Sequence, residues 1–155
     1  MTHEYFLWLS VFAYAIHIFE ETVLDWKGFT ESVSGIKNLK WADFFVANTA
    51  VLTMGICGAM IGWQLPFFAL LLPSLQLING LFFHLIPTIY LRRLSPGVIS
   101  SCLLFFPIGV LCYWGADRDY FLHNSTIFSS IFCATILSIT PLLFFKLQLI
   151  LKSKR

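Results

Sequence analysis

The sequence predicts an all-α protein: a polytopic membrane helix bundle with about five transmembrane helices, built as one domain over residues 1–155. Only 12% of the residues are charged, whereas 58% are hydrophobic, and soluble domains carry roughly twice that charge. The apolar residues gather in runs of about 20, the length that crosses a hydrocarbon core. We therefore expect an integral membrane protein, located in the bacterial inner membrane, without a separate soluble domain.

Five apolar segments account for most of the chain. The expected spans are about 5–24, 41–63, 65–91, 96–115 and 121–151. The second span contains Gly58-x-x-x-Gly62, a pattern that lets a neighbouring helix approach closely, so this face can also join two copies as a homo-oligomer. The third span carries Pro73 and Pro87, which leave carbonyls without helical partners and can bend the helix.

The connection over residues 25–40 is the longest between spans. Its apolar residues recur at helical spacing, which predicts a short interfacial helix. These residues are Phe29, Val33, Ile36 and Leu39.

The distribution of basic residues predicts the orientation. With the N-terminus outside and the C-terminus in the cytoplasm, nine of the ten lysines and arginines are cytoplasmic, and only Arg118 lies outside. The nine are Lys27, Lys37, Lys40, Arg92, Arg93, Lys146, Lys152, Lys154 and Arg155. This asymmetry follows the positive-inside rule.

A short polar motif, His17-Ile18-Phe19-Glu20-Glu21, ends the first apolar segment. Residues three and four apart share a helix face, so His17 lies over Glu20 and Glu21. Ionisable side chains inside a membrane span are costly and usually mark a functional site. The motif is therefore the main candidate site of the chain.

Depth along the helices brings further polar residues to the level of His17. His17 lies seven residues inward from Leu24, which is about 10 Å along a helix. Asn48 lies at the same depth in the second span, and His84 in the third. Asn79 is deeper and lies about 140° around an ideal helix from His84. Both can face one cavity if Pro87 or Pro73 distorts the third span.

The motif resembles the one that names the HXXEE family, small integral membrane proteins of uncharacterised function. The resemblance extends to a second histidine, His84 in Asn79-Gly80-Leu81-Phe82-Phe83-His84. A Tyr-x-Pro-Gly element of that family is matched in part by Leu94-Ser95-Pro96-Gly97, where Leu94 replaces the tyrosine. The resemblance covers roughly two thirds of the chain. It implies a membrane-bound enzyme and no particular substrate.

The first chemical interpretation is a divalent metal site. His17, Glu21 and His84 would form a two-histidine, one-carboxylate set, which suits Zn²⁺ or non-haem iron. Glu20 would be a further ligand or a catalytic general base. Asn48 or Asn79 would orient ligands or bound groups from outside the ligand set. This arrangement requires the first and third spans to be neighbours that approach closely on the Gly80 side.

Three other interpretations stay open. The histidines and glutamates could move protons in a metal-free isomerase or cyclase of lipid-like substrates. They could carry protons or cations in a transport or sensing bundle, or form a hydrogen-bonded network that only fixes helix packing. In the enzymatic interpretations the partner is a membrane lipid or another hydrophobic or amphiphilic small molecule. The chain contains no Walker loop, nucleophile elbow or nucleic-acid motif, so no nucleic-acid partner is expected.

Two adjacent arginines follow the third span. Arg92 and Arg93 most simply anchor the helix at the membrane interface. They could instead hold an anionic headgroup or pair with Glu20 or Glu21.

Overall fold

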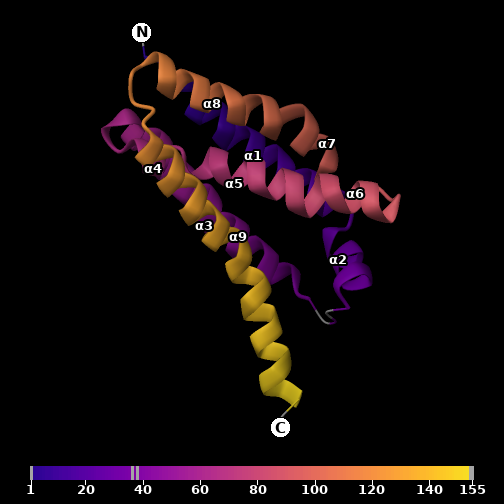
Figure 1. Ribbon diagram of the computed structural model, residues 1–155. Helices are drawn as coiled ribbons and strands as arrows, with labels where there is room; N and C mark the ends of the chain where they lie inside the picture. The colour runs from indigo at the N-terminus through magenta and orange to yellow at the C-terminus, as the bar shows by residue number, and fades with distance from the viewer. Residues whose placement is uncertain (1, 36, 38, 154–155) are drawn as a thin grey trace.

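The computed structural model describes residues 2–35, 37 and 39–153, with side-chain surroundings described up to residue 140. All regular elements within these residues are helical, which confirms the all-α fold class. Four helical stretches are long and apolar enough to cross a membrane: Tyr5–Val23, Trp41–Gln64, Pro66–Leu91 and Val98–Arg118. Each lies within three residues of its expected boundaries. The fifth apolar helix, α9 (Asn124–Ser153), runs beyond the other helices toward the C-terminus (Figure 1).

The first long helix, α1 (Tyr5–Val23), lies at the centre of the bundle, in contact with α3, α5 and α8. Its buried side chains include Leu7, Ser10 and Tyr14. Ser10 Oγ donates to Gln76 Oε1 at 2.7 Å, and Gln76 Nε2 donates to the Ser10 carbonyl at 2.7 Å. This reciprocal pair satisfies two buried polar side chains and joins α1 to α5.

A short helix, α2 (Trp26–Ser34), follows α1, as the helical spacing predicts. Asp25, with φ of 53°, begins it by accepting a hydrogen bond from the Gly28 N–H. Gly35, with φ of 69°, ends it in the left-handed conformation that favours glycine. Phe29 is buried on the inner face, and the Arg93 guanidinium lies 5.4 Å from its ring centroid. Ile36, also expected in this helix, lies outside the described residues.

The second long helix, α3 (Trp41–Ile61), turns back through η1 (Gly62–Gln64) into α4 (Pro66–Ala69). Gly58 is buried, and a Cβ atom there would lie 3.2 Å from the Phe68 carbonyl oxygen. This part of the small-residue face therefore packs against α4 within the same chain.

The third membrane-length stretch consists of α5 (Leu71–Asn79), a π-helical turn η2 (Gly80–Leu85) and α6 (Ile86–Leu91). The fourth has the same construction: α7 (Val98–Ser100), a second π-helical turn η3 (Ser101–Phe105) and α8 (Phe106–Arg118). Each π-helical turn ends two residues before a proline, Pro87 or Pro107. A proline lacks the N–H that would continue the α-helical ladder and clashes with the preceding turn, which accounts for the wider turn.

A polar cluster joins the N-terminus of α1 to the ends of α3 and α8. Asp119 accepts hydrogen bonds from the His3 N–H and, at 2.7 Å, from the Trp63 indole N–H. The His3 ring contacts the same carboxylate at 2.7 Å. Partial burial raises the pKa of the Asp119 carboxyl, but the hydrogen bonds from His3 and Trp63 outweigh it and hold the pKa below its usual value.

Candidate metal centre

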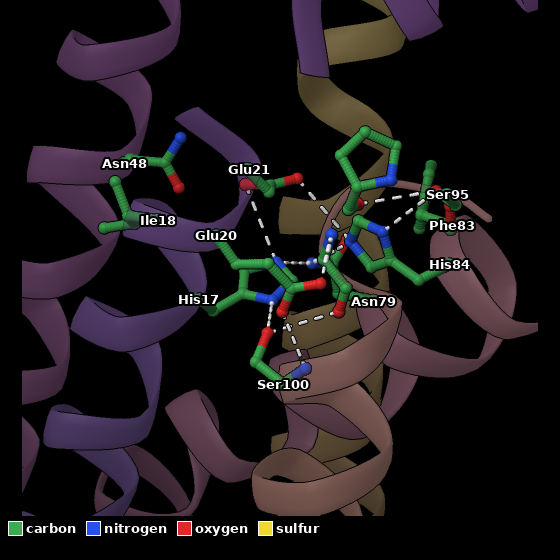
Figure 2. A network of polar contacts seen from close by, with 12 residues as sticks. His17, Ile18, Glu20, Glu21, Asn48, Asn79, Phe83, His84, Ser95 and Ser100 are labelled. Atoms are coloured by element: carbon green, nitrogen blue, oxygen red, sulfur yellow. Dashed lines mark hydrogen bonds and ion pairs between the residues drawn. The ribbon is translucent and has the colours of Figure 1, made fainter. Parts of the chain in front are cut away.

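Three buried side chains from α1 and η2 converge on one point. His17, Glu21 and His84 are only 1%, 5% and 2% exposed. Glu21 Oε2 lies 3.6 Å from His17 Nε2, and Glu21 Oε1 lies 3.6 Å from His84 Nε2. All three ligand atoms lie within 4.8 Å of one another, and Figure 2 shows Glu21 directed toward the two imidazoles. The i, i+4 spacing and the depth calculation predicted that these three residues lie together, and the structure brings them together.

The far nitrogen of each imidazole contacts a serine. His17 Nδ1 lies 2.8 Å from Ser100 Oγ, and His84 Nδ1 lies 3.3 Å from Ser95 Oγ. The Gly97 carbonyl, 3.2 Å from Ser100 Oγ, is an acceptor for the Ser100 proton, and with the proton so directed the Ser100 oxygen accepts from an N–H at His17 Nδ1. A neutral imidazole protonated at Nδ1 has its lone pair on Nε2, and that lone pair faces the centre.

His84 is oriented in a similar way, through a carbonyl that a proline leaves free. In an α-helix the Phe83 carbonyl would accept from residue 87, but Pro87 has no N–H. The Ser95 hydroxyl lies 3.4 Å from this carbonyl and 3.4 Å from the Pro96 carbonyl, and it can donate its one proton to either. With the proton so directed, the Ser95 oxygen accepts from His84 Nδ1, and the Nε2 lone pair of His84 lies on the side of the centre.

The π-helical turn brings Asn79 to the same centre. On an ideal α-helix, Asn79 and His84 lie about 140° apart, but η2 begins directly after Asn79 and reduces the rotation between the two residues. The Asn79 amide nitrogen consequently lies 3.3 Å from His84 Nε2 and 3.5 Å from His17 Nε2. The third span is therefore distorted before Pro87, which is the condition under which the two residues could share a cavity, and both contact one site.

Glu20 lies apart from this cluster, although it is the neighbour of Glu21. Its Oε1 accepts from the N–H groups of Gly97 at 3.0 Å and Ile99 at 3.1 Å, and its Oε2 accepts from Ser100 N–H at 2.7 Å. The carboxylate is thus bound to the backbone at the start of α7. The structure does not place it among the candidate ligands, where the sequence interpretation had put it.

The loop before α7 covers the two histidines. Gly97 has φ of +95°, and a Cβ atom there would lie 2.5 Å from His17 Cε1 and 2.7 Å from His84 Cε1. The prediction that the first span approaches the third at Gly80 is wrong. A Cβ atom on Gly80 would instead meet Ser101 and Phe106 of the fourth membrane-length stretch, at 3.2 and 3.3 Å. Gly97 is the glycine that permits close approach at the site.

The remaining predicted residues lie outside the cluster. Asn48 accepts from the Tyr14 hydroxyl at 2.7 Å and donates to the Phe44 carbonyl at 3.0 Å, and Figure 2 shows it apart from the imidazoles. Arg92 and Arg93 are exposed. The ion pairs among the described residues join histidines to carboxylates, so neither arginine pairs with Glu20 or Glu21.

Three site residues received no role from the sequence: Ser95, Gly97 and Ser100. Ser95 and Gly97 belong to the Leu94–Gly97 element, so the family resemblance was the signal that could have marked them. Leu94, at the tyrosine position, is 68% exposed, so the departure from the family pattern removes no side chain from the centre. Ser100 carried no signal in the sequence.

The geometry defines a buried group of electron-pair donors. Two imidazole lone pairs and a carboxylate face one another, and the His–Glu separations of 3.6 Å are too long for hydrogen bonds. Two atoms that each bind one zinc ion at about 2.0–2.2 Å lie at most about 4.4 Å apart. The two His–Glu separations of 3.6 Å are within this limit, and the three ligand atoms together lie within 4.8 Å of one another, so a small inward movement of the side chains would let one divalent cation contact all three.

The fold and the cluster define the class: an α-helical protein with membrane-length helices and a buried two-histidine, one-carboxylate group. The family model described as "Protein of unknown function with HXXEE motif" matches residues 8–112, and the chain belongs to this family. No curated protein and no solved structure matches the chain in the comparisons made.

Proposed function

We propose that this protein is a membrane-embedded, metal-dependent enzyme whose centre consists of His17, Glu21 and His84. The observation that carries the proposal is the convergence of two imidazole nitrogens and one carboxylate, all buried, within 4.8 Å of one another. Two histidines and one carboxylate form the ligand set of many catalytic zinc sites and of non-haem Fe(II) oxygenases. Both kinds of site keep positions open for a substrate.

The chain's own residues have separate roles in this proposal. His17, His84 and Glu21 hold the metal, and Ser100 and Ser95 keep both Nε2 atoms unprotonated. The Asn79 amide, beside both Nε2 atoms, can donate a hydrogen bond to a substrate oxygen at the centre. When bound, Zn²⁺ supplies Lewis-acid chemistry and iron supplies oxidative chemistry.

The surroundings of the centre favour a hydrophobic or amphiphilic substrate. Each ligand belongs to a membrane-length helical stretch, so a reactant reaches the site through or beside the bilayer. Phe19 in the same motif and Phe82 near His84 are 70% and 57% exposed, as expected of side chains that face lipid. The metal-free acid–base interpretation fits less well, because no His–Glu hydrogen bond is formed at 3.6 Å.

Metal content of the purified protein tests the proposal. We expect about one zinc or iron ion per chain, as for a mononuclear site, and its loss in His17→Ala, His84→Ala and Glu21→Gln. His123→Ala is the matched control, because His123 is exposed and outside the cluster, and it should retain the metal. A wild-type protein that binds no divalent metal, or a Glu21→Gln variant that binds it equally well, would overturn the metal site.

The enzymatic part has its own test. Wild-type protein and Glu21→Gln are reconstituted with zinc or iron(II) in nanodiscs that contain a bacterial lipid extract, and the extract is compared by mass spectrometry after incubation. A lipid-like species that changes only with the metal-loaded wild type is expected. A metal-loaded wild type that alters no component would argue for a metal site without this activity.

A further inference from the structure

The carboxylate of Glu20 binds the start of the fourth membrane-length stretch. It accepts hydrogen bonds from three backbone N–H groups, those of Gly97, Ile99 and Ser100. The first N–H groups of a helix have no partner within the helix and need an acceptor, which is usually the side chain of the N-cap residue. Here the acceptor comes from α1, 77 to 80 residues away in the chain.

The N-cap residue of α7 cannot perform this task itself. It is Gly97, which has no side chain, and any Cβ atom there would overlap the His17 and His84 rings. The close packing of the loop on both imidazoles therefore requires a glycine, and a glycine requires an external cap. Glu20 supplies it.

The capped backbone in turn orients His17. Ser100 both donates its N–H to Glu20 at 2.7 Å and contacts His17 Nδ1 through its hydroxyl at 2.8 Å. The Gly97 carbonyl that receives the Ser100 proton belongs to the same capped turn. His84 depends on a different support, because Ser95 N–H donates to Thr88 Oγ1 at 3.0 Å and not to Glu20.

We propose that Glu20 is the positioning residue of the centre: it caps α7 and thereby fixes the orientation and tautomer of His17 through Ser100. This proposal rests on the metal site proposed above, because the orientation of His17 matters for function only if His17 binds a metal. The two adjacent glutamates then have different tasks, since Glu21 binds the ion and Glu20 holds the turn that aligns its histidine partner.

The first test needs no metal. Nitrogen-15 NMR of the histidine side chains distinguishes the two neutral tautomers in the metal-free protein in detergent. In the wild type, His17 should be protonated at Nδ1. In Glu20→Gln the amide NH₂ opposes a backbone N–H, the turn loosens, and His17 should populate both tautomers while His84 remains unchanged.

Two further variants keep this test decisive. Ser100→Ala removes only the hydroxyl, so it should alter His17 in the same way even if Glu20→Gln folds poorly. Glu31→Gln is the matched control, because Glu31 also accepts a backbone N–H, that of Leu39 at 2.9 Å, away from the centre. A His17 tautomer that is unchanged in both Glu20→Gln and Ser100→Ala would overturn the proposal.

The second test is metal affinity. Loss of a residue that orients a metal ligand weakens metal binding by about 10- to 100-fold. We therefore expect the metal affinity of Glu20→Gln to fall by this factor. X-ray absorption spectroscopy should show the same metal ligands in the variant as in the wild type. Combining Glu20→Gln with Ser100→Ala should weaken binding hardly further, because both act through one path.

The outcomes separate the two proposals. Loss of a carboxylate ligand in Glu20→Gln, or fully additive losses in the double variant, would show that Glu20 acts as a ligand or independently, against the positioning role. A wild type that binds no metal but shows the expected His17 tautomers would overturn the metal site and leave the positioning role standing.

Discussion

At the scale of single residues, Gly97 shows how closely the chain approaches the histidines. Gly97→Ala combines a left-handed backbone, which costs about 1–2 kcal/mol for other residues, with overlap against both imidazoles, which costs about 1–3 kcal/mol. We expect destabilisation of about 2–5 kcal/mol and loss of bound metal. Denaturant unfolding in detergent and metal analysis measure the two effects.

Gly35→Ala is the matched control for this prediction. Gly35 also has a positive φ, +69°, but nothing lies within 4 Å of the position its Cβ would take. The variant should show only the backbone cost and should keep the metal. Equal destabilisation of the two variants, with metal retained in both, would contradict the role assigned to the Gly97 contact.

At the scale of elements, the π-helical turn η2 matters most, because it brings Asn79 and His84 to one side. Pro87→Ala restores an N–H that can bond to the Phe83 carbonyl, so the turn can tighten toward an α-helix and compete with Ser95 for that carbonyl. We expect metal affinity to fall by about tenfold, the smallest loss that is usual when the support of a metal ligand is weakened. Circular dichroism should show no loss of helix.

Pro73→Ala provides the comparison, because Pro73 lies within α5, outside the π-helical turn. It changes the same residue type in the same membrane-length stretch and should leave metal affinity unaltered. If Pro87→Ala bound metal as tightly as Pro73→Ala, the wide turn would have no part in building the centre.

At the scale of the whole molecule, the bundle has two differently charged ends. The contact of Arg93 with Phe29 shows that the turn after α6 lies at the same end of the bundle as α2. Lys27 in α2 and Lys40 directly before α3 add positive charge to this end. The opposite end carries the cluster of His3, Trp63 and Asp119, next to Arg118. The positive-inside rule predicts that the first end faces the cytoplasm.

Cysteine labelling tests this orientation. In a variant without the four native cysteines, a single cysteine replaces Tyr120, which is 89% exposed, or Lys37, which is also exposed. A membrane-impermeant maleimide should label Tyr120→Cys in intact cells, and Lys37→Cys only after permeabilisation. The reverse pattern would invert the topology, and the cysteine-free parent reports background labelling.

The long apolar helices and the proximity of His17, Glu21 and His84 could be predicted because they depend on local physics. Apolar runs of about 20 residues need a bilayer and satisfy their own backbone as helices. The spacing of His17 and Glu21 fixes one helix face, and equal depth from the span ends brought His84 to their level. These features require no knowledge of which side chains pack together.

The division of labour between Glu20 and Glu21 required the packed structure. Adjacent helix residues point about 100° apart, and helical periodicity does not say which of them faces which neighbour. Packing of α1 against α7, with His84 of η2 beside Glu21, decided that Glu21 meets the histidines and Glu20 meets the start of α7. Asn79 and Gly97 likewise reach the site through a π-helical turn and a left-handed glycine. Both are departures from α-helical geometry, which periodicity assumes throughout.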